Sequence, residues 1–506
     1  MTITAEARAP GDADQPVRIG SVTFIRFFLR FKEPGAVTVP GFPDRDENAA
    51  WGRERAHLLV DTDPWGRPHL PGTSLAGALR EMAGDADGAA AADMLFGHLL
   101  PAGSGGTEVD ARASLIWVLG SRPVGPDDHE LDAVASQVRA STSISRTRAA
   151  AEANTLRVEE LLPAGSRFEV FLRWDDAPAA NLDRLLDLLA AWRPLIGRGT
   201  SRGRGRCVID GVYHGTLRLD DPAGLHRWLT TSGPALARAV ATTKVQAGST
   251  AGDVRPLIRV TMKIIGPLRV GSGEPAEATG GQGQKVTPMF RDGDRYVLPG
   301  TGLKGLLRSR AEYILRSVSL SPEPCLDQQC GRCWTCEVFG FGGGKDPQAG
   351  VAGARAAIRV TDAVVEAPEP VQRQHVAIDR FTGGARDGLL YTVEALEGGT
   401  FAVSIEPLAS EIPPIRMTEI RAILRLVLED LDDGIAGVGA GVASGYGSVS
   451  VDLHDAETRG DLPDGRAARA ELARMVTASA QAGVRSAQAG ERSAPAGEKS
   501  APAGER

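Results

Sequence analysis

Residues 298–308 read LPGTGLKGLLR, and residues 70–80 read LPGTSLAGALR. The two stretches lie 228 residues apart and are identical at eight of their eleven positions. A Pro-Gly turn followed by leucines at helical spacing predicts the start of an amphipathic helix, with Thr73 or Thr301 as its cap. Because the same helix start occurs once in each half of the chain, it indicates an internal duplication.

Further matches support the duplication, because they follow in the same order in both halves. Each half ends on a glycine-rich loop, IGRGTSRGRGR at 196–206 and VGAGVASGYG at 438–447, and four glycines of the two loops superpose at an offset of 242. The other matches are an apolar strand (22–29 and 258–265), a Phe-Gly pair (96–97 and 339–340), an Ile-x-Arg triplet (144–146 and 378–380), a Val-Glu pair (158–159 and 393–394) and a Gly-x-x-Phe stretch (165–168 and 398–401).

Each repeat predicts the element order β-α-β-β-α-β, in which the second helix is the amphipathic run 181–192 or 417–431. This order predicts an α+β fold made of two tandem ferredoxin-like (RRM-like) sheets, each with both helices on one face. The opposite face of each sheet would then be free to bind a ligand.

The predicted boundaries follow from the ends of the matches and from composition. We expect a disordered segment at 1–17, a first repeat at 18–215, a linker at 216–255 and a second repeat at 256–454. Residues 455–506 are expected to form a polar helix and then, from about Ala478, a low-complexity tail that has too few apolar residues to fold.

Composition limits the class of protein. The 506 residues are 42% hydrophobic and 24% charged, which is ordinary for a globular protein. The net charge of −7 argues against coating of nucleic acid by the whole surface, although a local basic groove is compatible with it. Aromatic residues make up only 5%, which argues against many stacking platforms. No signal-peptide core and no run of 18 apolar residues occurs, so we expect a soluble cytoplasmic protein without a membrane partner.

Four of the five cysteines are clustered, at Cys325, Cys330, Cys333 and Cys336. Four thiolates at this spacing predict a tetrahedral zinc site, and the closed ligand set makes that zinc structural. An iron–sulfur cluster and four unrelated thiols are the alternatives. A zinc enzyme unrelated to RNA would need an open coordination position, which an all-cysteine set does not leave.

Three of these motifs together resemble the RAMP superfamily: the Pro-Gly-Thr helix start, the Ile378-Asp379-Arg380-Phe381-Thr382-Gly383 hairpin and the terminal glycine-rich loop. The likeness is greatest to the repeating backbone subunit of type III CRISPR effector complexes and spans about 18–215 and 256–454. It implies an RNA-binding scaffold that holds guide RNA for pairing with target RNA in antiviral defence, beside other effector subunits. The hairpins at 141–156 and 378–390 would be the thumbs of the two repeats.

The resemblance and the chemistry of these motifs together predict the RNA-binding residues. Glycine turns and helix starts present N–H groups to phosphates, and guanidinium groups bind phosphate oxygens. The same glycines could serve only a tight turn, and the threonines only a helix cap. The predicted contacts are Thr73, Ser74, Arg80, Arg146, Arg198, Arg202, Arg204, Arg206, Thr301, Lys304, Arg308, Arg380, Gly445, Tyr446 and Gly447.

The alternative function is metal-dependent cleavage of target RNA at regular spacing. The resemblance implies an acid in the long loop after the first strand, where Asp44 and Asp46 are the candidates. A carboxylate there could act as a general base or bind a divalent metal. It could equally be a solvated loop residue, and His57 and His375 are expected to pack rather than to catalyse.

Overall fold

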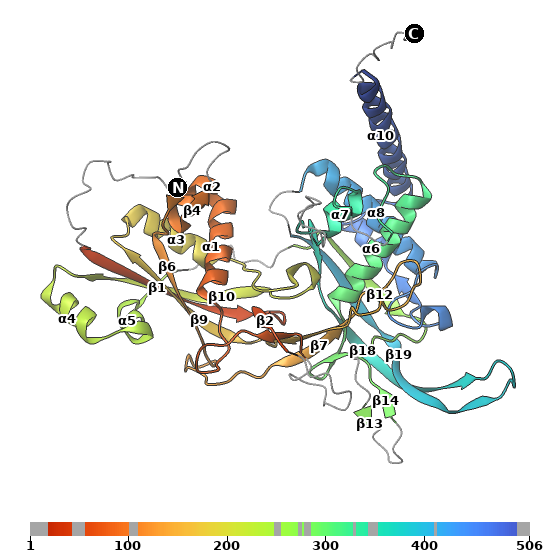
Figure 1. The fold of residues 1–506 in the computed structure, drawn as a ribbon, viewed down its shortest axis with the longest axis horizontal. Coiled ribbons are helices and arrows are strands. Elements are labelled where there is room, and N and C mark those ends of the chain that lie inside the picture. Colours follow the sequence, from red (N-terminus) through yellow and green to blue (C-terminus); the bar gives the residue numbers. More distant parts are fainter. Residues whose placement is uncertain are drawn as a thin grey trace, which may run out of the picture. The chain divides into compact units, whose positions relative to one another are not determined.

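A computed structural model describes residues 19–42, 56–100, 110–246, 255–271, 276–277, 285–326, 330–342, 353–408 and 412–492 (Figure 1). Its described residues form two compact units. Unit 1 contains the residues up to Ser143 together with Ala151–Arg255. Unit 2 contains Ile144–Ala150, Pro256–Gly271 and the described residues from Ala276 onward.

Unit 1 is built on a five-stranded antiparallel sheet with β1 at its centre. Its order is β11-β10-β1-β9-β6, and α1 and α3 are the helices that connect β1 to β6 and β9 to β10. The elements are β1 (Ser21–Phe31), α1 (Gly72–Asp87), α2 (Ala89–Phe96), β6 (Ile116–Pro123), β9 (Arg167–Asp175), α3 (Ala179–Ala191), β10 (Cys207–Arg218) and β11 (Thr243–Lys244).

The central strand β1 buries side chains on both of its faces. Ile25 and Phe27 pack in one core cluster with Leu79 of α1 and Leu185 of α3. Side chains alternate along a strand, so Val22 and Phe24 face the other way. They form a second cluster with residues of α5 (Gly233–Val240).

The segment 216–246 of the predicted linker 216–255 therefore belongs to the fold of unit 1. It contains α4 (Pro222–Thr230) and α5, and Leu236 and Val240 lie one turn apart and cover Val22 and Phe24. The expectation of a sheet face open to a ligand is wrong for this part of unit 1, because a stripe of apolar residues in the supposed linker covers it.

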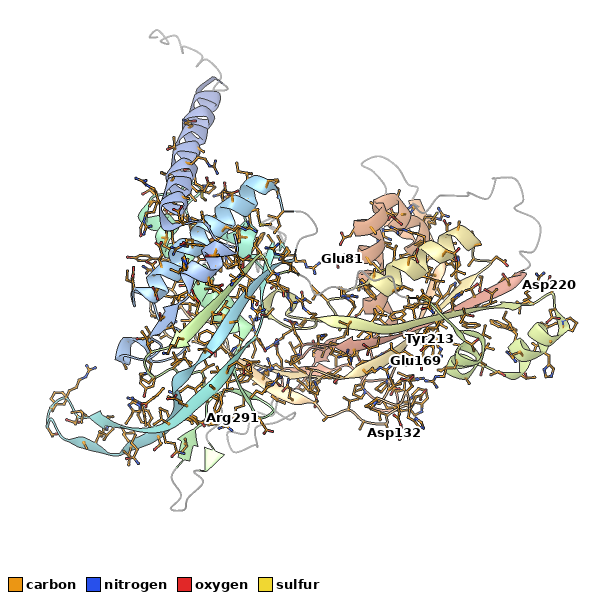
Figure 2. The ribbon with its side chains drawn as sticks, turned by 180° about the vertical axis from the view of Figure 1, so that it is seen from behind. Glu81, Asp132, Glu169, Tyr213, Asp220 and Arg291 are labelled. Carbon is orange, nitrogen blue, oxygen red and sulfur yellow. The ribbon has the colours of Figure 1, made fainter. Side chains whose placement is uncertain are left out.

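Ion pairs continue this covered face beyond the apolar cluster. Arg26 of β1 donates to Glu169 of β9 over 2.9 Å and lies 4.3 Å from the ring centroid of Tyr213. Figure 2 labels Glu169 and Tyr213 on this sheet. Arg238 of α5 also pairs with Glu169, which is buried. Arg26 and Arg238 are thus both paired with Glu169 within the unit.

A smaller sheet of unit 1 has the order β2-β3-β8-β7. Its strands are β2 (Thr38–Pro40), β3 (Leu58–Val60), β7 (Gln137–Ser141) and β8 (Arg157–Leu161), while β4 (His98–Leu100) and β5 (Asp110–Arg112) form a separate pair. The β7–β8 connection corresponds to the predicted first thumb, and its tip, Ile144–Ala150, groups with unit 2 by its contacts.

Unit 2 repeats the arrangement of unit 1. Strand β12 pairs with β19 and β20, and β17 pairs with β19, all antiparallel, which gives the order β20-β12-β19-β17. In unit 1 the corresponding order is β10-β1-β9-β6. The elements are β12 (Ile258–Ile264), α6 (Gly300–Ser317), α7 (Trp334–Phe339), β17 (Ile358–Val360), β19 (Ala385–Pro407), α8 (Pro414–Asp432) and β20 (Val449–Val451). The duplication inferred from the sequence is therefore a duplication of topology.

On β12 one face is apolar and the other polar. Ile258, Val260, Met262 and Ile264 are buried in the core with α6 and α8, whereas the residues between them are exposed. This strict alternation is typical of a strand with one covered face.

A long hairpin extends from the sheet of unit 2 (Figure 1). It is formed by β18 (Ala363–Ile378) and β19, which pair antiparallel from Val365 opposite Phe401 to Ile378 opposite Ala385. Shorter strands lie near its base: β13 (Ala276–Glu277), β14 (Lys285–Thr287), β15 (Arg291–Asp292) and β16 (Arg295–Leu298).

The C-terminal part of unit 2 is helical, with α9 (Leu453–Thr458) and α10 (Gly465–Arg492). Ala468 of α10 is buried against Ala422 and Leu426 of α8. Helix α10 continues past Ala478, the point at which the sequence predicts a disordered tail, as far as Arg492. The rest of the predicted tail and the segment 1–17 lie outside the described residues. No helix in the described part of the chain is long and apolar enough to cross a membrane.

Candidate nucleic-acid interface and metal site

The two glycine-rich loops have the same backbone conformation. Each contains a short 3-10 helix, η2 (Thr200–Arg202) or η4 (Val442–Ser444), with a left-handed glycine on either side. All eight glycines that superpose in the sequence have a positive φ: Gly197, Gly199, Gly203 and Gly205 in the first loop, and Gly439, Gly441, Gly445 and Gly447 in the second. The two loops therefore match in backbone conformation at each of the four superposed glycine positions.

Both loops pack against the chain that follows the first strand of their repeat. The N–H of Arg198 donates to the carbonyl of Ala36 over 3.2 Å, and that of Ala440 donates to Arg269 over 2.8 Å. A Cβ at Gly197 would lie 1.9 Å from the Ala36 oxygen, and one at Gly439 would lie 2.3 Å from the Arg269 oxygen. Close backbone packing thus requires these glycines, whatever else the loops bind.

The arginines of the first loop surround a buried carboxylate, Glu159 of β8. Arg204 is buried and donates to Glu159. Burial alone would raise the pKa of Glu159, but Arg204, Arg202 and Arg198 outweigh it and lower that pKa. Burial also lowers the pKa of Arg202, as do like charges around it, including Arg157. Several guanidinium groups therefore share one carboxylate, and positive charge is in excess here.

The four arginines predicted from the sequence differ in their surroundings. Arg198 is exposed and Arg202 half-buried, whereas Arg204 is held inside the unit. Arg206 lies 3.5 Å from Glu33. Arg198 and Arg202 are accordingly the members of this set that can reach an outside anion, and Arg204 and Arg206 hold the loop.

In the second loop an aromatic residue occupies the position of Arg204. Tyr446 is buried, and its hydroxyl lies 2.8 Å from Nε2 of His375 on β18. His375 also stacks on Tyr391 of β19, with ring centroids 5.2 Å apart and ring planes 17° from parallel. The guanidinium of Arg373 lies 5.9 Å from the centroid of the Tyr446 ring.

The two helix starts differ from the prediction that a threonine caps them. The N-cap residues of α1 and α6 are Pro71 and Pro299, whose side chains form no capping hydrogen bond. Thr73 and Thr301 lie inside the first turn, two residues after the N-cap position. In α6 the N–H of Gly300 instead donates to Asp362 over 2.8 Å.

Of the other residues predicted at the helix starts, Ser74 and Thr301 are half-buried and Thr73 is exposed. Lys304 is only 7% exposed. These residues lie at the starts of α1 and α6, where the sequence predicts helix starts. Burial of Lys304, however, limits the access of a phosphate to its ammonium group.

Arg80 and Arg308 have the same internal role in the two repeats. Arg80 donates to the carbonyl of Gly97 and pairs with Asp93. Arg308 donates to the carbonyl of Gly340 over 2.7 Å and to Glu312 over 2.8 Å. Each arginine ties its helix to the Phe-Gly turn of the repeat. Since the fold itself uses both guanidinium groups, we do not propose them as RNA contacts.

The two Ile-x-Arg motifs form the same turn. Ser145 N donates to Ala150 O over 2.9 Å, and Asp379 N donates to Gly384 O over 2.9 Å. Ala149 has a φ of 50° where the second turn has a glycine, Gly383.

The arginines of the two turns lie in different surroundings. Arg146 donates from Nε to buried Glu312 of unit 2 over 2.7 Å. Arg380 is exposed at the hairpin tip, next to Phe381, which is 98% exposed. Arg146 therefore has an internal partner, while Arg380 is displayed to solvent.

The four clustered cysteines come together after α6: Cys325 and Cys330 precede α7, Cys333 is its N-cap residue and Cys336 lies within it. Their Sγ atoms all lie within 4.8 Å of one another. The Sγ of Cys325 lies 3.6 Å from those of Cys333 and Cys336. Four sulfurs around one tetrahedral ion would be about 3.8 Å apart, whereas a cluster of several irons would hold them farther apart. The geometry fits a single metal ion.

The surroundings of the cysteines favour the thiolate form at Cys333 and disfavour it at Cys325 and Cys336. Burial by itself would raise the pKa of Cys333, but the Thr335 hydroxyl and the backbone N–H of Cys336 outweigh it and lower that pKa to about 6. Burial raises the pKa of Cys325 and Cys336. The guanidinium of Arg308 lies 3.5 Å from the Cys336 sulfur, where its charge would offset that of a metal-bound thiolate.

Comparison with protein families finds one match that covers both repeats. The model of the RAMP superfamily matches residues 12–208 and 261–450. The chain belongs to the RAMP superfamily. This family is associated with CRISPR-associated complexes. A comparison with curated proteins gives no match.

The match with two copies explains why the glycine-rich loops, the helix starts and the Ile-x-Arg turns each occur twice in this RAMP chain. The sequence did not single out Glu159, Glu312 or Tyr391 as functional residues. Glu159 and its counterpart Glu394 were visible as a repeated Val-Glu pair, and this was the available clue. Glu312 has no such signal, because the corresponding residue of the first repeat is Gly84.

The candidate acids of the nuclease alternative, Asp44 and Asp46, lie outside the described residues of the RAMP chain. Cleavage stays a prediction. His57, which shares the first long loop with them, accepts a hydrogen bond at Nδ1 from the N–H of Val158 over 3.2 Å.

Proposed function

We propose that this RAMP protein is an RNA-binding scaffold subunit of a type III CRISPR effector complex in the cytoplasm. It would hold guide RNA along the phosphate backbone while base pairing selects target RNA, beside other subunits. The observation that carries the proposal is the excess of guanidinium groups around Glu159 in a chain whose net charge is −7. A local concentration of positive charge in an acidic protein fits a polyanionic partner.

The strand order supports an RNA-binding sheet. In both units the strands equivalent to 4-1-3-2 of a βαββαβ unit lie side by side. We take both as ferredoxin-like, RRM-like sheets. The glycine-rich loops lie between the second helix and the last strand, at the same place in both repeats.

Arg198 and Arg202 would be the principal phosphate contacts of the first loop. Arg198 is exposed, and Arg202 shares Glu159 with other guanidinium groups, so a phosphate would relieve the repulsion among them. Arg204 and Arg206 would support the loop from within.

The four cysteines would hold a structural zinc ion. Zinc is the usual occupant of a compact four-cysteine site, and it would fix α7 against α6. The purified protein should contain one zinc per chain by elemental analysis, and Cys333→Ser should abolish it. Iron in place of zinc would contradict this assignment.

Binding of single-stranded RNA tests the function. The double variant Arg198→Ala/Arg202→Ala should bind more weakly, and the slope of log affinity against log salt should fall by about 1.4, since each phosphate contact on a single strand contributes about 0.7. The matched control is Arg218→Ala/Arg469→Ala, which removes two exposed arginines elsewhere.

The control should leave the affinity and the slope close to wild type. If both double variants lower the slope equally, binding is non-specific and the basic loop is not the RNA site. If the wild-type chain binds no RNA at low salt, the proposed function itself is wrong.

A further inference from the structure

The base of the β18–β19 hairpin carries a short stack of aromatic rings. His375 and Tyr391 are directly opposite each other in the strand register, and their rings are 17° from parallel. Behind them, Tyr446 of the glycine-rich loop lies 2.8 Å from His375 Nε2. Only five tyrosines occur in the whole chain, and two of them are here.

Exposure increases along the stack. Tyr446 is 7% exposed, His375 is half-buried and Tyr391 is 52% exposed. The hydrogen bond to Tyr446 fixes the imidazole, and the imidazole in turn supports one face of Tyr391. A flat aromatic surface is thereby held rigidly at the protein surface, which lowers the entropic cost of stacking a ligand on it.

A cross-strand aromatic pair can serve stability alone, contributing roughly 0.2–1 kcal/mol to a hairpin. Two observations point beyond that role. The stack is anchored on the glycine-rich loop, and the first repeat lacks it. There Arg204 takes the place of Tyr446, and Leu156 stands two residues before Val158, as Tyr391 does before Val393.

The chemistry of the second loop selects the ligand. Its residues 438–447, VGAGVASGYG, include no charged side chain, in contrast to the four arginines of the first loop. That segment offers a phosphate no cation, and Arg373, which lies beside the Tyr446 ring, is already paired with Glu397. Every nucleobase, by contrast, has a flat π-face. We propose that Tyr391, supported by His375 and Tyr446, stacks one unpaired nucleobase of the RNA. This inference rests on the proposed function.

The two repeats would then bind the same RNA by different forces. The first loop would bind phosphate electrostatically, and the second would bind a base by stacking. Salt separates the two contributions, because stacking releases no counterions.

The test measures the affinity of the full chain for a labelled single-stranded RNA of mixed sequence across a range of salt concentrations. Tyr391→Leu, which installs the residue of the first repeat, should weaken binding by about 5- to 150-fold without changing the salt slope. Tyr391→Phe keeps the ring and should bind like wild type. Tyr313→Leu is the matched control, because Tyr313 of α6 is 53% exposed in the same unit.

Tyr391→Leu should have no effect on the affinity for a matched oligonucleotide that lacks its bases. The inference is overturned if Tyr391→Leu binds normal RNA as wild type does, if Tyr313→Leu is equally weak, or if Tyr391→Phe is as weak as Tyr391→Leu. In those cases RNA binding itself persists and the proposed function stands. A wild-type chain that binds no RNA overturns both.

Discussion

The buried carboxylate Glu312 is a sensitive point of unit 2, and its replacement by glutamine should destabilise that unit. Glu312 is fully buried and accepts from Arg308 over 2.8 Å and from Arg146 over 2.7 Å. Glutamine has nearly the same shape but no charge, and its amide nitrogen cannot accept a hydrogen bond. The substitution therefore removes the countercharge of two guanidinium groups and one of their two acceptor oxygens.

The magnitude follows from burial. Breaking a buried ion pair from one side costs about 3–5 kcal/mol, because the other charge stays buried without compensation. Arg308 keeps its bond to the Gly340 carbonyl, which favours the lower end of this range. The control is Asp93→Asn, which removes the acid that pairs with Arg80 in the other repeat. That pair is 38% exposed on both sides, so the cost should stay below about 1 kcal/mol.

Hydrogen exchange in a denaturant series can measure both variants, since it reports the opening free energy of α6 and α1 separately in a chain with two units. Glu312→Gln should lower the value for α6 and also the protection of Ile144–Ala150, whose Arg146 loses its acceptor. If Glu312→Gln costs no more than Asp93→Asn, or leaves Ile144–Ala150 equally protected, the role assigned to Glu312 is wrong.

Three further results are expected. Gly439→Ala should lower the free energy of unfolding by at least about 1–2 kcal/mol, because a Cβ there would meet the Arg269 carbonyl. Gly302→Ala, in a helix with open space around it, should be neutral or stabilising by up to about 1 kcal/mol. Thermal melting of the two variants compares these effects. Removal of metal by a chelator should increase amide hydrogen exchange in α7. The variant Cys333→Ser, which lacks one of the four thiols and should hold no metal, should not respond to the chelator. Folding lowers the pKa of Glu159, so the ionised carboxylate stabilises unit 1 above its ordinary pKa of about 4.3, and this contribution is lost as the pH falls below that value. The unfolding free energy of unit 1 should therefore depend less on pH in the acid range in Glu159→Gln than in the wild type.

Sequence alone determined the features whose signals are local. Glycines at fixed spacing predicted two equivalent loops, and the structure places all eight in the left-handed region. The central strands and the second helices lie where alternation and helical spacing predicted them. The cysteine cluster was equally visible, because its ligands lie within twelve residues of one another.

Tertiary structure decided which charges remain available to a partner. Arg80, Arg204 and Arg308 look like phosphate ligands in the sequence, yet Asp93, Glu159 and Glu312 occupy them inside the fold. Tyr391 and Tyr446 are 55 residues apart and meet only through His375. A sequence reveals the backbone conformation that a glycine permits, because that is a property of one residue. The accessibility of a charge or a ring depends on partners that only folding brings near.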